Sequence, residues 1–171
     1  MHFFTADEHF AHTNILKYCD RPFKDIEEMD NEIIRRHNEL VKTCDTVWHL
    51  GDFTLREEKE ALNYIRRLNG SHVFIKGSHD YWADNVFNVP LPYIIEEMIN
   101  GIYVVGCHYA MRTWPRSYHG SILAYGHSHG NLPPDKNQWD VGVDNNDFYP
   151  VSLDKLLKLT KYEPRKNDRK S

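Results

Sequence analysis

The sequence contains no long hydrophobic run and no cysteine framework, and these two absences exclude several classes of protein. No apolar stretch approaches the ~20 residues that a helix needs to cross a bilayer, so we expect no association with a membrane. The three cysteines, Cys19, Cys44 and Cys107, are widely spaced and form no paired motif. We therefore expect reduced thiols in a cytoplasmic protein.

Positive charge is scarce over most of the chain. The formal net charge is −4, but the segment from Lys155 to Ser171 holds seven Lys/Arg and two acidic residues, so the remainder carries −9. A body of that charge does not attract polyanions through its general field, which disfavours nucleic acid as a partner. We expect a single domain over residues 1–162 and a flexible, polar, basic tail over 163–171.

The first half of the chain alternates strand and helix patterns. Three short apolar runs read as strands at 3–6, 46–50 and 72–76. Between them, one helical pattern begins after Asp25, with Glu28 completing a capping-box signature, and a second spans 56–68. This order favours a parallel sheet with helical crossovers.

The second half shows a different pattern. Asn100-Gly101 lies between apolar runs at 93–98 and 102–107, which is typical of a type I′ hairpin. Further strands are expected at 122–125 and 141–143, followed by a helix capped by Ser152. We expect this half to be mostly antiparallel. The chain is then an α/β protein with two stacked sheets and helices outside.

Side chains that ligate metals follow the predicted strands in five places. They are Asp7 and His9, Asp52, the run Gly77-Ser78-His79-Asp80, His108, and the run Gly126-His127-Ser128-His129. Carboxylates and neutral imidazoles gathered at one sheet edge predict a site for two divalent cations. Mixed nitrogen and oxygen ligands suit Mn, Fe, Co, Ni or Zn better than Ca or Mg.

Strand geometry predicts how these ligands group. Residues i and i+2 of a strand point the same way, so Asp7 and His9 should reach one cation, and His127 and His129 should do the same. Asp52 follows a glycine, and its two carboxylate oxygens could bridge two ions.

Taken together, these runs resemble the calcineurin-like metallophosphoesterases, over nearly the whole chain from Phe3 to about Leu157. The sequence is most similar to small bacterial and phage members that carry Phe-Thr-x-Asp-x-His-Phe and Tyr-Cys-x-Arg-Pro-Phe segments. The resemblance implies a four-layer αββα sandwich of two mixed sheets flanked by helices. This agrees with the stacked sheets expected from the residue pattern.

The resemblance also implies ligand roles. One ion would be held by Asp7, His9 and His129 and the other by His108, His127 and position 78, with Asp52 shared. The family has Asn at position 78, where this chain has Ser78. A hydroxyl is a shorter and poorer neutral ligand, so we expect a weakened second site. Manganese is the ion expected first.

The expected reaction is hydrolysis of a phosphate diester, or less readily a monoester, by a hydroxide bridging two ions. His79 is the candidate general acid or phosphate donor, because imidazole titrates in the useful range. Asp80 would orient His79 or its loop, and the Arg112 guanidinium suits a phosphate. The aromatic residues that follow His108 would either form a stacking wall or pack a loop: Tyr109, Trp114 and His119.

Two alternative functions remain open at this point. A nuclease would need a basic surface that the acidic body does not provide. A binding scaffold that has lost activity would explain Ser78, but it has no physical need for five imidazoles beside two carboxylates. The expected partner is a small phosphate ester such as a nucleotide. The sequence predicts no particular oligomeric state.

Overall fold

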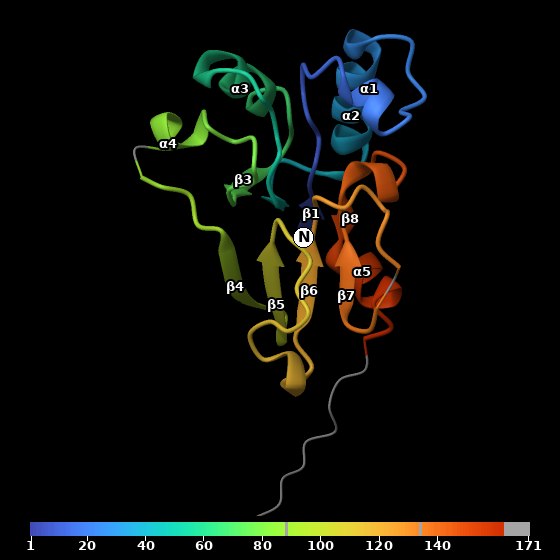
Figure 1. Ribbon diagram of the computed structural model, residues 1–171. Coiled ribbons are helices and arrows are strands. Elements are labelled where there is room, and N and C mark those ends of the chain that lie inside the picture. The colour runs from blue at the N-terminus through green and yellow to red at the C-terminus, as the bar shows by residue number, and fades with distance from the viewer. Residues whose placement is uncertain (88, 134, 163–171) are drawn as a thin grey trace, which may run out of the picture.

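A computed structural model describes residues 1–162 apart from 88 and 134 (Figure 1). The predicted basic tail, 163–171, lies outside the described residues. Within the described part, no helix has both the length and the apolar character needed to span a membrane.

The first sheet contains three parallel strands and one antiparallel edge strand. Helices α2 (Ile26–Leu40) and α3 (Glu58–Ile65) connect the parallel strands, as the alternating pattern predicted. In sheet order, the strands are β3 (Ser71–Phe74), β2 (Thr46–His49), β1 (His2–Thr5) and β8 (Val151–Ser152).

The second sheet has the order β4, β5, β6, β7, with bounds Ile94–Ile99, Ile102–Cys107, Ile122–Tyr125 and Gln138–Asp140. Asn100 and Gly101, with φ of 51° and 80°, join β4 to β5, which confirms the predicted two-residue hairpin. However, β6 runs parallel to β5 and β7 parallel to β6.

The prediction of a mostly antiparallel second half is therefore wrong. The connections 108–121 and 126–137 are long enough to return the chain for a parallel strand. Among their described residues neither contains an α-helix, so neither leaves a helical period in the sequence. The last strand of this sheet also ends at Asp140, before the predicted 141–143.

Local capping signals explain where the longer helices begin. The Asp25 carboxylate accepts a hydrogen bond from the Glu28 N–H at 2.9 Å, and the Glu28 carboxylate accepts one from the Lys24 N–H at 2.8 Å. Ser152 caps α5 (Leu153–Leu159) by accepting from the Lys155 N–H. Four short elements carried no periodic signal: α1 (Ile15–Tyr18), α4 (Ala83–Val86), η1 (Ser117–His119) and η2 (Val143–Asn145).

Alternate residues of the strands pack into different cores. Phe4, Val104 and Ile122 lie in a core between the two sheets, which α5 joins through Leu153 and Leu156. A second core lies beneath the helices that cover the first sheet: Phe10, Met29, Ile33, Phe53 and Phe74 are among its members. This arrangement confirms an α/β fold with two mixed sheets and flanking helices.

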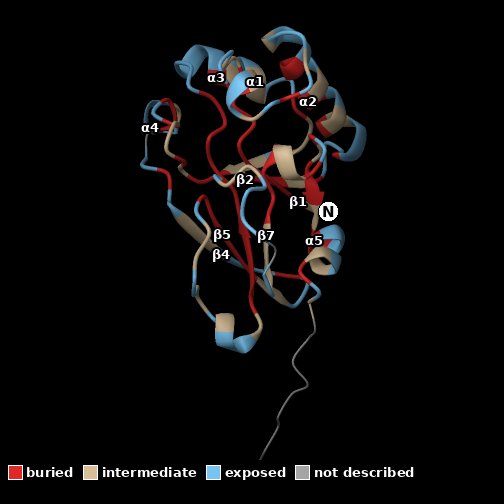
Figure 2. Ribbon diagram, turned by 45° about the vertical axis from the view of Figure 1, so that its right-hand side comes forward, coloured by how far each residue is buried: buried red, intermediate tan, exposed pale blue. Residues whose placement is uncertain are grey.

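The outer face of the second sheet is covered by a loop. Val105 and Leu123 alternate with the inter-sheet residues and pack against Met111 and Trp114. In Figure 1, the arrowheads of β5, β6 and β7 point toward α1, α2 and α3. Strands β1, β2, β5 and β6 and the first residues after them are largely buried, whereas the outer surfaces of α2 and α3 are exposed (Figure 2). The loops at these strand ends therefore meet inside the molecule.

Candidate metal centre

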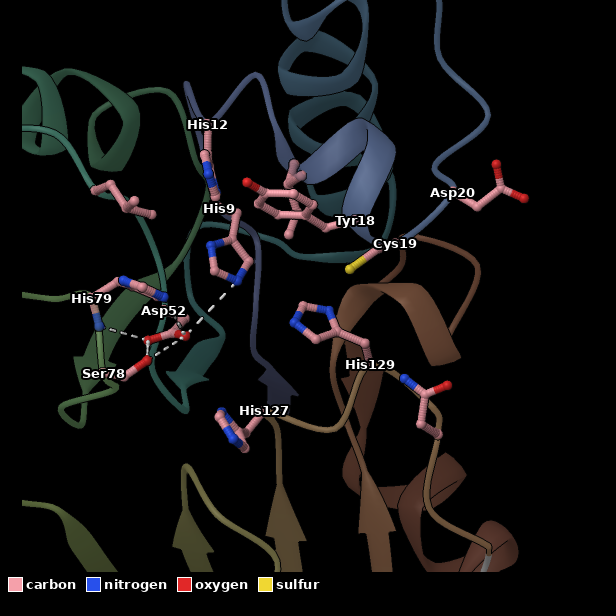
Figure 3. Close-up of a pocket in the computed structure, with 13 residues that line it drawn as sticks. His9, His12, Tyr18, Cys19, Asp20, Asp52, Ser78, His79, His127 and His129 are labelled. Atoms are coloured by element: carbon pink, nitrogen blue, oxygen red, sulfur yellow. Dashed lines mark hydrogen bonds and ion pairs between the residues drawn. The ribbon is translucent and has the colours of Figure 1, made fainter.

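The loops that follow the strands gather polar side chains at one cavity of about 720 Å³ (Figure 3). Asp7 and His108 are fully buried and do not line this cavity. Asp7 and His9 come after β1, Asp52 after β2, and Ser78 and His79 after β3. His108 follows β5, and His127 and His129 follow β6. The two sheets thus contribute to one site from their carboxyl ends.

Five of the predicted ligands occupy left-handed backbone conformations. Their φ angles lie between 47° and 67°, a region that side-chain-bearing residues rarely adopt; they are Asp7, His9, Asp52, His127 and His129. Each costs on the order of 1–3 kcal/mol, and such conformations persist where surrounding structure holds them. The chain turns sharply at each of these residues instead of continuing as a strand.

The ligands fall into two adjacent groups. Ligand atoms of Asp7, His9 and His129 lie within 4.8 Å of one another, and so do those of Asp52, His108 and His127. The strand-parity prediction that His127 and His129 share one group is wrong, because both residues have positive φ. The division instead matches the one implied by the resemblance.

Asp52 lies between the two groups. One of its oxygens, Oδ2, is 3.3 Å from Nε2 of His108 and 3.8 Å from Nε2 of His9. This carboxylate is therefore close to one histidine of each group.

Several ligand atoms are buried without a hydrogen-bond partner among the described residues. They are Oδ1 of Asp7, both ring nitrogens of His9, and Nε2 of His108. Leaving buried polar atoms unpaired costs about 1–3 kcal/mol each, so native proteins rarely do it without a ligand. These atoms converge on one place and have the chemistry of divalent-cation ligands. The residues present therefore fit a metal site.

Burial shapes the charges of the first group. Burial raises the pKa of Asp7 to about 8 and lowers the pKa of His9 to about 3. A neutral His9 ring offers a lone pair at physiological pH, which is the form that binds metals. Burial also penalises the charge on Asp7, and a bound cation would offset that penalty.

In the second group, the negative charge of the carboxylates and the positive charge of the protonated imidazole stabilise each other. Burial alone would lower the pKa of His108, but the adjacent Asp52 and Asp7 carboxylates outweigh it and raise the pKa to about 9. Burial alone would raise the pKa of Asp52, but His108 and the His79 N–H outweigh it and hold the pKa below its ordinary value. A cation that binds here must displace the His108 proton, so binding should release protons.

Neighbouring groups fix the orientation of the imidazoles. Nδ1 of His108 donates to the Leu50 carbonyl at 2.8 Å, and Nδ1 of His129 donates to the Asp144 carboxylate at 2.7 Å. Each contact leaves Nε2 for a ligand role. Asp144 also outweighs the effect of burial on His129 and raises its pKa.

Arg21 anchors this arrangement, and the sequence interpretation gave it no role. Its guanidinium donates to both Asp144 oxygens, at 2.7 and 2.8 Å, and to the carbonyls of Asp7 and Glu8. It is buried and ties the first ligand loop to the support of His129. Its position in the Tyr-Cys-x-Arg-Pro-Phe segment is the sequence feature that could have identified Arg21 as part of the site.

Asp80 holds two loops together. Its carboxylate accepts hydrogen bonds from the N–H groups of Asp52, Phe53 and Gly77 at 2.7–2.9 Å. A Cβ added to Gly77 would lie 2.3 Å from the Asp52 nitrogen, so only glycine allows this approach. Asp80 does not line the cavity, and its contacts position the ligand loops.

Ser78 and His79 both line the cavity and both contact Asp52. The Ser78 hydroxyl donates to the Asp52 oxygens at 3.0 and 3.2 Å, and the His79 N–H donates to Oδ1 at 2.9 Å. Nε2 of His79 lies 3.9 Å from Oδ2 of Asp52, on a side chain that is 42% exposed. The His79 ring is thus accessible from the cavity.

The structure does not bring Arg112 into this cavity. Its exposed side chain lines a separate hollow with Tyr125, Asp135 and Gln138. The proposed aromatic wall is absent from the cavity lining as well. Tyr109 packs its ring edge against His127, Trp114 joins the outer core of the second sheet, and His119 lies in η1.

Comparisons with solved structures describe the fold. A protein of unknown function, AQ665 from Aquifex aeolicus, superposes with a TM-score of 0.72 at 22% identity, over 93% of this chain and 98% of that chain. It shares the fold. A predicted phosphoesterase from Streptococcus pneumoniae and Yfce, a phosphoesterase from E. coli, align with TM-scores of 0.46 and 0.44 at 15% and 17% identity. They cover 82% of this chain and 70% and 77% of their own, and at these scores we draw no argument from them.

No known protein-family model matches the sequence. A relative of nearly equal length is found among proteins of known sequence. It is the uncharacterized protein MJ1445 of Methanocaldococcus jannaschii, 36% identical over 163 residues, which cover 90% of this chain and 88% of the relative. At this identity and coverage, the chain belongs to the same protein family as MJ1445.

Proposed function

We propose that this protein is a calcineurin-like, metal-dependent phosphoesterase that hydrolyses a small phosphate diester in preference to a monoester. The observation that carries the proposal is the pair of adjacent ligand groups with Asp52 between them. Buried ligand atoms without partners in both groups support the same conclusion. Two metal ions held side by side in this way can promote phosphoryl transfer to water.

Each ligand group would hold one divalent ion, with manganese the expected choice. Asp7, His9 and His129 would bind one ion, His108 and His127 the other, and Asp52 both. When bound, the two ions supply Lewis acidity and a nucleophilic water at neutral pH. The protein supplies ligands whose orientation is fixed before the substrate arrives, which avoids reorganisation during the reaction.

His79 is the proposed donor to the phosphate ester. Its ring faces the cavity, while its own N–H fixes the loop to Asp52. From this position the ring can donate a hydrogen bond to a phosphoryl or leaving-group oxygen. Asp80 acts as a positioning residue, because its carboxylate accepts hydrogen bonds from the backbone N–H groups of Asp52 and Gly77, which belong to two different ligand loops. Arg112 has no part in the proposal.

Ser78 reduces the strength of the second ion site in this proposal. Its hydroxyl contacts the Asp52 oxygens, so it competes for the carboxylate that the ions would share. Replacing Ser78 by Asn would add a carboxamide oxygen with a longer reach. This substitution therefore tests whether position 78 limits metal binding.

The test is hydrolysis of p-nitrophenyl phosphate and bis(p-nitrophenyl) phosphate with added Mn²⁺. We expect metal-dependent cleavage that is faster for the diester, improved by Ser78→Asn and reduced to background by Asp52→Asn. Metal content after mild dialysis provides an independent reading of the number of ions held. If both the unsubstituted chain and Ser78→Asn are inert with Mn, Fe, Co, Ni and Zn, a non-catalytic binding role replaces this proposal.

A further inference from the structure

The cavity has two chemically distinct walls. One wall consists of four of the candidate ligands, together with Ser78 and His79; these ligands are His9, Asp52, His127 and His129. The other wall is the apolar part of the lining, Ile15, Tyr18 and Leu55, and the His12 ring lies next to the rings of both His9 and Tyr18. Figure 3 shows the Tyr18 ring on the same side as His12, above His9 and His129. The second wall has no role in metal binding and is available to another part of a ligand.

Tyr18 presents an open aromatic face. Its side chain is on the one-turn helix α1 and is 73% exposed, and Leu55 beside the same cavity is 42% exposed. The His12 ring meets Tyr18 edge-on at 6.1 Å between centroids and lies 5.5 Å from the His9 ring. An uninterrupted series of rings therefore leads from the candidate ligands to Tyr18. Apolar surface exposed inside a polar cavity is covered favourably by a planar group.

Cationic side chains do not line the described cavity, whereas the acidic residue Asp20 is at its edge. The guanidinium of Arg21 is occupied by Asp144 and backbone carbonyls, and Arg56 donates to the Ala11 carbonyl. Within the described lining, charge on a ligand would thus be met at the ligand groups and by the imidazoles of His12 and His79, without a Lys or Arg side chain. Each additional phosphate would remain without a partner near Asp20.

We infer that Tyr18 forms a stacking subsite for the planar aromatic group of a substrate that carries a single phosphate. This inference rests on the proposed function and specifies its substrate class. It favours a diester of a single phosphate that carries an aryl or nucleoside group over a nucleoside polyphosphate or a nucleic acid strand. Tyr18 thereby takes the stacking role that the sequence suggested for three residues that do not line the cavity: Tyr109, Trp114 and His119.

The test compares phenylphosphonate and methylphosphonate, two non-hydrolysable anions that differ in the planar group. Their binding to the Mn²⁺-loaded full-length protein is measured by calorimetry. We expect phenylphosphonate to bind about tenfold more tightly, as a stacking contact of ordinary strength provides. Tyr18→Ala should remove this preference while methylphosphonate affinity stays unchanged, and Tyr18→Phe should keep it.

Tyr118→Ala is the matched control. Tyr118 is 76% exposed but lies in η1, outside the cavity, so its loss should not alter either affinity. Binding of a fluorescent single-stranded oligonucleotide to the protein, if any, should not be weakened by Tyr18→Ala. Equal affinities for the two phosphonates, failure of both to bind, or an unchanged preference in Tyr18→Ala would each overturn the inference.

The result can be separated from that of the proposed function. Metal-dependent hydrolysis with no phenyl preference would leave the function standing and refute the subsite. A Tyr18-dependent preference for phenylphosphonate in a protein that hydrolyses neither nitrophenyl ester would support the subsite and refute the proposed function.

Discussion

At the scale of single residues, the candidate site is built from unfavourable backbone conformations. Asp7, His9, Asp52, His127 and His129 all have positive φ. A left-handed turn swings successive side chains in different directions, which places His127 and His129 in separate ligand groups. The strain lies at the residues that would bind ions, which is where a functional requirement can maintain it.

This strain predicts an unusual order of stability among variants at position 127. The His127 side chain is exposed, so its removal loses little packing, and its φ is 67°. In the presence of a chelator, His127→Gly should therefore be more stable than His127→Ala by about 1 kcal/mol. Denaturant unfolding of the two variants measures the difference.

His119 provides the matched control, because it is also an exposed histidine but has no positive φ. There the order should reverse, with His119→Gly less stable than His119→Ala by about 0.5–1 kcal/mol. If alanine is at least as stable as glycine at position 127, the left-handed conformation carries no strain.

The sequence could reveal the ligands but not what supports them. The predicted ligand residues share a recognisable pattern of strand, then carboxylate or imidazole, and the structure brings them together. Arg21 and Asp144 are 123 residues apart and have no joint signal in a single sequence. Their contact depends on how the η2 turn packs on the first loop, which only the folded chain defines.

At the scale of elements, locally encoded features were predicted best. The Asp25 and Ser152 caps and the Asn100-Gly101 turn depend on a few adjacent residues, and all three are present. The direction of β6 and β7 depends on long irregular connections, and this prediction failed. The direction of each of these strands depends on the connection that leads into it, and the sequence of these connections has no helical period to indicate a parallel return.

Helix α2 is joined to the segment before β3 by a buried histidine. Nε2 of His37 donates to the Asn69 carbonyl at 2.8 Å, and the ring stacks near His49. Burial lowers the pKa of His37 to about 4, compared with 6.5 in an unfolded chain. The unfolded state therefore binds more protons between these values, and His37 favours folding most above pH 6.5.

The free energy of unfolding should then fall as the pH drops below 6.5. His37 should contribute a loss of about 1.4 kcal/mol per pH unit until the pH nears 4. In His37→Gln this contribution disappears, so the stability gap between the natural chain and the variant should narrow from pH 6.5 to 5. Urea unfolding across this range measures the gap.

A comparison at pH 8 serves as the internal control. The imidazole is neutral there in both folded and unfolded states, so the gap reports lost packing and hydrogen bonding alone. A gap that stays constant from pH 8 to pH 5 would mean that His37 is not held neutral by burial.

At the scale of the whole molecule, the candidate centre connects the two sheets. Asp7, His9 and Asp52 follow strands of the first sheet, whereas His108, His127 and His129 follow strands of the second. Each ligand group draws on both sheets. Ions bound there would link the layers at the ends of their strands, in addition to the apolar core between them.

Metal should therefore stabilise the molecule as a unit. At an ion concentration of about 100 times the dissociation constant, the free energy of unfolding should rise by about 2.7 kcal/mol, because only the folded state assembles the site. Thermal unfolding with Mn²⁺ and with a chelator measures the change. Hydrogen exchange should slow together in the loops that follow β1, β2, β5 and β6.

Two carboxylate variants separate this linkage from general binding of cations. Asp52→Asn replaces the carboxylate between the groups by a neutral carboxamide and should remove most of the gain in both sheets. Asp84→Asn alters an exposed carboxylate of α4 that pairs with Lys76, so it should keep the full gain. A gain that survives Asp52→Asn, or slower exchange confined to the loops of one sheet, would show that the ions do not join the two layers.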